Sequence, residues 1–342
     1  MQSSRLSGGT LHVLDVRFHQ KEKKTKTQMV DCTEEDVKSF KEEIDRLRIV
    51  SQTGLQYFDA ELIFKDLSNI FTFRSFLTHE GKFDDIKRIT INKSILSENR
   101  RITEISHLKY PPAKYVKNYG RANLKNQSVL YGTFDMLTTL NEMKPDIGDL
   151  ICISTWKLKK DDNLIYSPIF KRWELEDGSV NLNMRLFETQ YKNLSKHYPK
   201  NVFRQIDLKN EFAADEFKKK VDRNIPDNYI FSAFFANEIL YNFWTDEGQA
   251  IDAILYPSVA SKGAFDNIAI KPSVFDNLYE LHSVKESIVV SRPTVRYKGY
   301  GLDGLSESDS IDFKVGKVNW KSNFYQPTEK MDFFIKNYSL KF

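Results

Sequence analysis

The chain has 342 residues, of which 40% are hydrophobic and 13% aromatic, so it can bury a sizeable core and is not expected to be mainly disordered. Its formal net charge of +4 is too small to indicate nucleic-acid binding by itself. Nothing resembles a signal peptide or a membrane span, and the two cysteines, Cys32 and Cys152, have no metal-ligand spacing. We therefore expect a cytoplasmic protein with no metal site, no membrane contact and no direct contact with nucleic acid.

The N-terminal region, residues 1–66, is predicted to form an accessory layer that carries no chemistry. Residues 11–18 alternate as a strand would, and the basic run 21–26 is more typical of a solvated turn than of an anion-binding arm. Thr33 is expected to cap a helix, because three acidic residues follow it in the first turn, where the helix dipole favours negative charge. A second helix is expected at 59–67.

Strands are expected from residue 70 onwards. Residues 71–76 alternate aromatic and polar side chains and carry Arg74, and residues 86–92 alternate again. Later patterns predict, in chain order, a strand at 149–158, a loop or hairpin at 159–180, helices at 184–198, 211–221 and 229–244, and short strands at 251–256, 268–271, 288–291 and 310–317. The aromatic-rich helix at 229–244 is expected to be the buried one.

The stretch from Gly120 to Pro145 combines a turn, a strand and a short helix. In the strand, alternation places Leu130 and Phe134 on one face and Tyr131 on the other. The turn before the strand carries a cation, the strand carries the aromatic hydroxyl of Tyr131, and the helix after it carries a carboxylate. The stretch therefore brings three kinds of functional group to the ends of its elements.

The helix in this stretch is predicted to begin after Asp135, a good N-cap, and to end before Pro145. Leu137 and Leu140 are expected to face inward. Glu142 then falls in the last turn, off that stripe, where the helix dipole disfavours an anion by up to ~1 kcal/mol. A locally unfavourable charge is where a functional site is worth suspecting.

Three side chains of this stretch have the chemistry of a nucleotide site. The guanidinium of Arg121 can hold a phosphate by paired hydrogen bonds, Tyr131 can stack on a ring or donate its hydroxyl, and the Glu142 carboxylate can stabilise positive charge that develops on a ribose. Taken singly, each also fits a structural role: a surface ion pair, a half-buried strand tyrosine and an exposed helix glutamate.

Ser258, Asn123 and Asn267 allow the same two interpretations, because each can orient a ligand or cap a turn. The six histidines show no metal spacing, and the strand–GxSxG–helix elbow of a serine hydrolase is absent. No Gly-rich phosphate loop of the Walker or dinucleotide type occurs either. Strands and helices are interleaved without the rhythm of a doubly wound sheet, so the pattern favours an α+β fold with a mixed sheet.

Considered in order, these residues resemble the RES domain family. The resemblance covers about residues 71–272 and rests on an ordered set of motifs: Gly120-Arg121-Ala122-Asn123, Val129-Leu130-Tyr131-Gly132, Leu140-Asn141-Glu142, Gly148-Asp149, Tyr256-Pro257-Ser258-Val259 and Asn267-Ile268-Ala269. No single motif is strongly specific, whereas the ordered set is. Many members carry an aromatic residue where this chain has Ala122, and both ends of the chain lie outside the match.

The resemblance implies a mixed β-sheet core of the ADP-ribosyltransferase-like type with added helical layers. Three regions then follow along the chain: an accessory region at 1–66, a RES-like catalytic domain at 67–290 with a helical insertion at about 159–245, and a C-terminal extension at 291–342 that packs on the domain.

The resemblance also implies an NAD⁺ phosphorylase or glycohydrolase, toxin-like, that cleaves the nicotinamide–ribose bond and passes ADP-ribose to inorganic phosphate or water. NAD⁺ is the substrate and phosphate the expected co-substrate, with no cofactor and no metal. The implied catalytic residues are Arg121, Tyr131, Glu142 and Ser258, and the implied nucleotide-binding residues are Arg74, Asn123 and Asn267. A DNA-binding antitoxin of the Xre-like type is the implied protein partner, and self-association is left open.

Two other functions fit the sequence. One is an ADP-ribosyltransferase that modifies a macromolecule, since the extra helical layers offer a docking surface. The other is a non-enzymatic module that binds nucleotides or nucleic acid, which rests on a pI of about 8.7 and the lysine run at 21–26.

Overall fold

The computed structural model describes residues 30–54, 59–72, 76–170, 182–222, 224–245, 247–296, 299–321 and 329–341. The chain divides into two compact units, each assembled from separate segments. Unit 1 comprises Met1–Gly81, Pro112–Val129 and Asn163–Ala264, and unit 2 comprises Lys82–Pro111, Leu130–Asp162 and Phe265–Phe342. The chain therefore passes between the units five times, at the five breaks between these segments.

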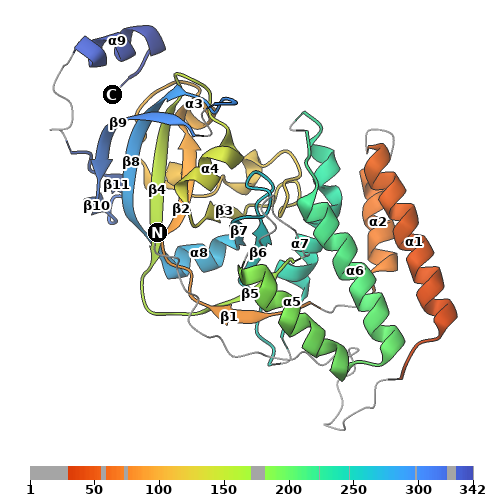
Figure 1. Cartoon of the computed structure of the whole chain (residues 1–342). Coiled ribbons are helices and arrows are strands. Elements are labelled where there is room, and N and C mark those ends of the chain that lie inside the picture. The colour runs from red at the N-terminus through yellow and green to blue at the C-terminus, as the bar shows by residue number, and fades with distance from the viewer. Residues whose placement is uncertain are drawn as a thin grey trace. The chain divides into compact units, whose positions relative to one another are not determined.

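Unit 1 is mainly helical. Its described helices are α1 (Glu34–Thr53), α2 (Ala60–Ile70), α5 (Leu182–Leu194), α6 (Lys200–Lys218) and α7 (Ile230–Asn242), with short 3₁₀ turns η3 (Ala113–Tyr115), η4 (Ser195–His197) and η5 (Pro226–Tyr229). Thr33 caps α1 through a capping box with Asp36, as the first-turn acids predict. The helix α1 lies alongside α6, to which it is joined by an ion pair of 2.8 Å between Arg48 and Asp215 (Figure 1).

The helix α6 begins at Lys200, so the predicted start at residue 211 was wrong. Asn210 was taken as the residue before the helix, but it lies inside it. The buried side chains Ile206, Phe212 and Phe217 extend over most of the helix, and this packing outweighs the weak helix propensity of an asparagine.

The predicted strand at 71–76 is not a strand where the structure describes it. Phe71 is the C-cap of α2 and is buried, with its ring stacked on Phe212 at 6.0 Å. Phe71 packs in a cluster with side chains of α6 and α7, so the period-two pattern was misleading. Residues 73–75, which include Arg74, lie outside the described residues, as do the predicted strand 11–18 and the basic run 21–26.

The described strands of unit 1 are β1 (His79–Gly81), β5 (Leu164–Pro168) and β6 (Ala253–Pro257). β1 pairs antiparallel with β5, and β5 pairs parallel with β6, so the sheet is mixed, as predicted. The helix α7 is buried along nearly its whole length, which confirms the prediction for 229–244.

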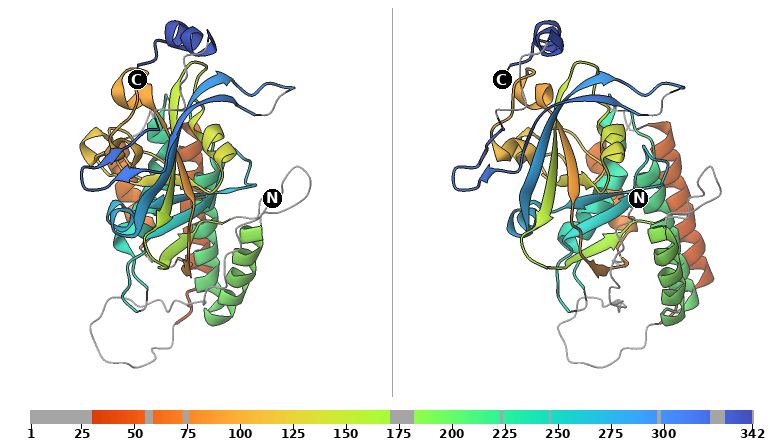
Figure 2. Two further views of the ribbon diagram at one scale, coloured as in Figure 1. Left: turned by 90° about the vertical axis from the view of Figure 1, so that its left-hand side faces the viewer. Right: turned by 60° about the vertical axis from the view of Figure 1, so that its left-hand side comes forward.

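Unit 2 is built on an antiparallel sheet with the strand order β7-β3-β2-β4-β8-β9. The bounds are β2 (Ile86–Ile91), β3 (Leu130–Thr133), β4 (Leu150–Leu158), β7 (Asp266–Ile270), β8 (Tyr279–Ser291) and β9 (Gly301–Ser308). β8 is much longer than the strand predicted at 288–291, and β9 was not predicted; the two run side by side as the long pair in Figure 2.

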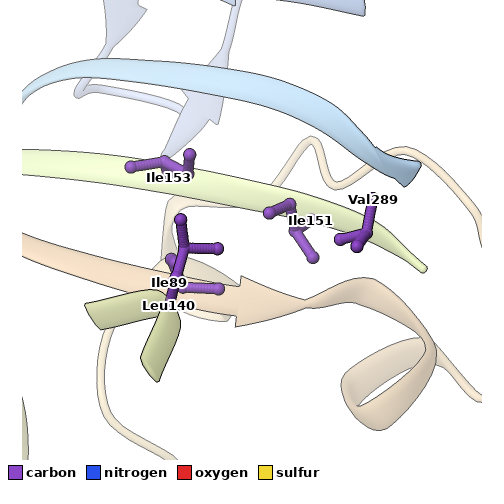
Figure 3. Close-up of a cluster of buried hydrophobic side chains, with 5 residues drawn as sticks. All are labelled: Ile89, Leu140, Ile151, Ile153 and Val289. Atoms are coloured by element: carbon purple, nitrogen blue, oxygen red, sulfur yellow. The ribbon is translucent and has the colours of Figure 1, made fainter. Parts of the chain in front are cut away.

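The described helices of unit 2 are α3 (Asn92–Leu96), α4 (Met136–Met143), α8 (Pro272–Leu278) and α9 (Glu329–Tyr338), with the 3₁₀ turn η2 (Ile105–Leu108) and a small hairpin of β10 (Ile311–Asp312) and β11 (Lys317–Val318). Leu140 of α4 packs on a buried cluster from three strands, shown in Figure 3: Ile89, Ile151, Ile153 and Val289. This cluster fixes α4 to the sheet.

The described residues are 41% helix and 25% strand with a large mixed sheet, so the α+β class is confirmed. The ADP-ribosyltransferase-like arrangement and the three sequence regions at 1–66, 67–290 and 291–342 stay predictions. Within the described ranges, no helix is long and apolar enough to cross a membrane.

Candidate functional site

The short helix α4 forms where the sequence places it. Both carboxylate oxygens of Asp135 accept hydrogen bonds from the first turn, from the backbone N–H groups of Leu137 and Thr138 at 2.9 Å each. Lys144 ends the helix in the left-handed conformation, with φ at 50°, and Pro145 follows. Glu142 therefore lies in the last turn of α4, as predicted.

The face that α4 turns toward the sheet differs from the prediction. Leu140 is buried, but Leu137 is 43% exposed, so its assignment as an inward residue was wrong. The rotation of the helix is set by threonines. The Thr139 hydroxyl donates to the Asp135 carbonyl at 2.8 Å and contacts the Thr133 hydroxyl of β3, which holds the threonine side of α4 against the sheet.

This rotation brings Glu142 to the sheet and to Asn267. β3 and β7 pair antiparallel, with Thr133 opposite Asn267 and Tyr131 opposite Ala269. From β7, the Asn267 Nδ2 donates a hydrogen bond of 2.9 Å to Glu142 Oε1. The two residues are 125 positions apart in the chain. Glu142 is half-buried and Asn267 is 6% exposed, so the contact is largely sheltered from water.

Tyr131 lies on β3, and alternation places it on the same face of that strand as Thr133. Its ring is half-buried. Unit 2 therefore joins three of the predicted site residues: Glu142 and Asn267 are in direct contact, and Tyr131 is on the strand beside them.

Sequence reasoning missed Arg88, which supports this strand from β2. Its Nη1 donates to the Tyr131 carbonyl at 3.1 Å, and its Nε is buried with no hydrogen-bond partner among the described residues. Burial lowers the pKa of the Arg88 guanidinium to about 10, against the opposing influence of Tyr131. The available signal was an arginine between the apolar residues of the strand 86–91, where a charged side chain is rarely buried without a reason.

The other predicted residues lie in unit 1. Arg121 follows Gly120 in a tight turn and closes the C-terminal end of α6. Its Nη1 donates to the carbonyls of Phe217 and Lys219, the latter at 3.1 Å, and its Nη2 donates to Lys219 at 3.1 Å. The guanidinium also lies over the Tyr229 ring, 5.1 Å from its centre. A cation at this position complements the helix dipole.

Asn123 and Ser258 are both buried in turns of unit 1. The Asn123 Nδ2 donates to the Leu124 carbonyl at 2.9 Å, and its backbone closes the turn with Gly120. Ser258 follows β6, and its Oγ accepts from the Ser261 backbone N–H at 3.2 Å. Each residue shapes a turn, which is the structural role that the sequence allowed.

Arg121 and Ser258 are linked through one aromatic contact. Phe217, whose carbonyl accepts from Arg121, packs its ring on Tyr256 with centres 5.3 Å apart, and Tyr256 is two residues before Ser258. Unit 1 therefore groups Arg121 and Ser258 around the Phe217–Tyr256 contact, as unit 2 groups Tyr131, Glu142 and Asn267.

Other reactive groups were also considered. No cluster of three or more histidine, cysteine, aspartate or glutamate side chains suited to a metal occurs in the part of the chain that the structure describes. Cys152 is buried in β4, and burial raises the pKa of its thiol, which makes it a poor nucleophile. A cavity of about 440 Å³ in unit 2 is lined by residues such as Lys93, Asp146 and Tyr338, and by none of the predicted site residues.

No protein-family model and no curated protein sequence matches this chain.

The function is therefore inferred from the chemistry of the site. The half-buried Glu142 carboxylate can only accept hydrogen bonds when it is ionised. It suits a ligand that donates hydrogen bonds, such as the hydroxyl groups of a sugar, and disfavours a phosphate. The guanidinium of Arg121, in unit 1, has the opposite preference.

Proposed function

We propose that this protein degrades NAD⁺ by cleaving the nicotinamide–ribose bond and transferring ADP-ribose to inorganic phosphate or water. The observation that supports the proposal most strongly is the hydrogen bond between Asn267 and Glu142. The resemblance to the RES domain named these two residues from separate motifs, and nothing in their local sequence requires them to meet.

The proposed reaction requires that positive charge on the ribose be stabilised. The bond between the anomeric carbon and the nicotinamide nitrogen breaks, and its electron pair leaves with nicotinamide, which becomes neutral. Positive charge develops on the ribose, and an oxygen of phosphate, or of water that releases a proton, bonds to the anomeric carbon. A carboxylate held beside the ribose stabilises that charge, as in glycoside hydrolysis.

Glu142 is suited to this role because Asn267 fixes one of its oxygens. A neutral amide donor orients the carboxylate without adding a positive charge, so the negative charge stays available to the ribose. Tyr131, on the adjacent strand, would pack on the nicotinamide end.

Arg121 would bind the pyrophosphate or the incoming phosphate, and Ser258 would fix the ribose or the pyrophosphate. Asn123 and Asn267 would shape the pocket. In this structure both Nη atoms of Arg121 donate hydrogen bonds to the carbonyls of Phe217 and Lys219 at the end of α6. Phosphate binding would use its remaining N–H groups or exchange some of those bonds for charge-assisted ones, which are roughly twice as strong as neutral ones.

The assay that tests the proposal follows nicotinamide release from NAD⁺ by the purified full chain, with and without phosphate. Glu142→Gln keeps the shape but removes the charge, and should lower the rate by roughly 10²–10³ if the charge stabilises the transition state. Glu280→Gln, the same change at an exposed glutamate of β8, is the matched control and should leave the rate unchanged.

A macromolecular acceptor of ADP-ribose is the second candidate function. It is favoured by exposed apolar side chains near the site: Met136 and Leu137 at the start of α4 are 44% and 43% exposed, and Phe265, just before β7, is 48% exposed. Because β7 runs antiparallel to β3, Phe265 lies alongside the residues that follow Thr133. Exposed apolar patches often mark protein contacts. Labelled NAD⁺ that transfers no label to any lysate protein or nucleic acid would exclude this candidate.

The setting and partners implied by the resemblance belong to the same proposal: a cytoplasmic NAD⁺-consuming toxin whose activity an Xre-like antitoxin would neutralise.

A further inference from the structure

Two buried oxygen atoms near Glu142 lack hydrogen-bond partners among the described residues. They are Thr138 Oγ1 on α4 and Asn267 Oδ1 on β7, in side chains that are 1% and 6% exposed. Leaving a buried polar atom unpaired costs about 1–3 kcal/mol, and nearly all such atoms in folded proteins have a partner. Two of them beside one carboxylate call for an explanation.

Both side chains neighbour Glu142, Asn267 through a hydrogen bond and Thr138 through its position on α4. Asn267 Oδ1 belongs to the same amide whose Nδ2 donates to Glu142 Oε1 at 2.9 Å. Thr138 precedes Glu142 by four residues, and residues at that spacing lie one above the other on a helix face. Side chains on a helix lean toward its N-terminus, so the Glu142 side chain leans toward Thr138.

The packing of α4 fixes the direction in which Thr138 points. Leu140 lies on Ile89 of β2 and Ile151 of β4, Thr139 contacts Thr133 of β3, and Glu142 meets Asn267 of β7. Going round the helix from Leu140 through Thr139 and Glu142, the next position is that of Thr138, roughly 40° beyond Glu142. The Thr138 hydroxyl is therefore on the β7 side of the helix, where Asn267 lies.

The partner that suits these atoms has to be small and has to donate. Both oxygens are enclosed, which excludes a sugar or a phosphate. Asn267 Oδ1 and the carboxylate only accept, so the partner must supply hydrogens to them, while the threonine hydroxyl can donate or accept. A water molecule meets these requirements, since a buried water typically makes about three hydrogen bonds to groups of this kind.

We propose that Thr138 is a positioning residue whose hydroxyl, together with Asn267 Oδ1, holds one water molecule against the Glu142 carboxylate. The water and the Asn267 amide hold the carboxylate from two sides and fix its orientation. The existence of this water site is independent of the enzyme activity, whereas its effect on catalysis rests on the proposed function.

The test compares three variants of the full chain with the wild type. Thr138→Val keeps the shape and removes the hydroxyl, and Thr138→Ser keeps the hydroxyl. Thr53→Val is the matched control, because Thr53 lies at the exposed end of α1 and its hydroxyl donates to the Ile49 carbonyl of its own helix at 2.8 Å. The readouts are a high-resolution crystal structure, the stability of each variant, and the kcat, KM and pH–rate profile for NAD⁺ cleavage.

We expect a water peak within hydrogen-bond distance of Thr138 Oγ1 and Asn267 Oδ1 in the wild type, in Thr138→Ser and in Thr53→Val, and none in Thr138→Val. We expect Thr138→Val to lower kcat roughly tenfold with little change in KM, as the loss of one hydrogen bond to a charged group implies. The acid limb of its pH–rate profile should move to higher pH, because the ionised carboxylate has lost support. Thr138→Ser should restore the wild-type profile, and Thr53→Val should leave it unchanged.

Two results would overturn the proposal. One is a well-ordered wild-type structure with no water at this position. The other is a Thr138→Val variant that cleaves NAD⁺ with the wild-type kcat and pH profile. If the wild-type chain does not cleave NAD⁺ at all, the proposed function fails, and diffraction from the wild type and Thr138→Val alone decides whether the water site exists.

Discussion

A single amide–carboxylate hydrogen bond, from Asn267 to Glu142, is the residue-level basis of the proposed site. The donor is neutral, and this matters because the alternative partners would change the charge. A cation at position 267 would neutralise the charge of Glu142, and an anion there would repel the Glu142 carboxylate. The amide does neither, so it can orient a carboxylate that must stay negative.

Replacing this amide by a carboxylate tests the idea. Asn267→Asp would place two like charges in contact, which raises the pKa of one of the two carboxyl groups. We expect NAD⁺ cleavage to fall at pH 7 and its acid limb to move to higher pH, whereas Asn267→Ala should lower the rate without moving the limb as far. A pH–rate profile of each variant checks this, and identical profiles for the two would contradict it.

His79 is a second residue whose burial has a measurable consequence. Its ring packs between Tyr166 and Phe187, with ring centres 5.6 and 5.2 Å away, and its Nε2 is buried with no partner among the described residues. Burial lowers the pKa of His79 to about 4. The unfolded chain therefore takes up a proton near pH 6.5 that the folded chain does not, and stability is lost as the pH falls from about 6.5 toward 4.

His79→Phe should remove this dependence. Between pH 7 and pH 4, protonation linked to His79 should lower the free energy of unfolding of the wild type by roughly 3 kcal/mol at most. Other titrating groups should change the free energy of unfolding equally in both proteins. Urea denaturation at pH 7, 5.5 and 4 measures the difference between the two. Parallel curves of stability against pH would show that His79 is not held neutral by the fold.

At the scale of elements, α4 shows how a polar contact can choose a helix face. A periodic pattern of two leucines predicts that both face inward, but the threonine contacts of α4 rotate the helix so that only Leu140 does. Leu140→Ala should cost about 2–4 kcal/mol, since it opens a cavity against the cluster in Figure 3. Leu137→Ala should cost less than about 1 kcal/mol, because the side chain is 43% exposed. Chemical denaturation of both variants compares the costs, and equal losses would contradict this orientation.

The end of α6 offers a comparable test for Arg121. If the guanidinium closes the last turn of α6, Arg121→Ala should lower the stability of the chain by about 1–3 kcal/mol in the absence of any nucleotide. Arg296→Ala, at an exposed position, is the control and should change it by less than about 0.5 kcal/mol. An Arg121 variant with wild-type stability and no activity would assign the residue to ligand binding alone.

Local signals predicted helix starts well where a capping side chain marks them, and predicted helix packing poorly. Thr33 and Asp135 cap the helices that they were expected to cap, because a cap depends on residues within one turn. The start of α6 and the length of β8 depend on which partner each element meets, and no short window of sequence holds that information. The polar strand β9 was missed for the same reason, since it is defined by its pairing with β8.

The candidate site could be predicted only in part. An ordered resemblance, and no local signal, predicted the set of Arg121, Tyr131, Glu142, Ser258 and Asn267, since each residue alone fits a structural role. Arg88 and Thr138 were not found, because an arginine in a strand and a threonine in a helix become notable only when the fold shows them buried with unpaired atoms.

At the scale of the whole molecule, both motif-bearing segments cross from one unit to the other. The segment with Arg121 and Glu142 crosses at Val129–Leu130, and the segment with Ser258 and Asn267 crosses at Ala264–Phe265. Each segment therefore gives predicted site residues to both units, and neither unit can be cut out as a single piece of chain. Any assay of function requires the full chain.

The most direct test of the central claim is the release of nicotinamide from NAD⁺ by the purified full chain, measured at several phosphate concentrations alongside Glu142→Gln and Glu280→Gln. We predict release by the wild type, a rate that rises with phosphate if phosphate is the acceptor, wild-type behaviour of Glu280→Gln, and a loss of roughly 10²–10³ in Glu142→Gln. Release that does not depend on phosphate would leave the hydrolytic reaction. No release under any condition, or an unchanged rate in Glu142→Gln, would contradict the account.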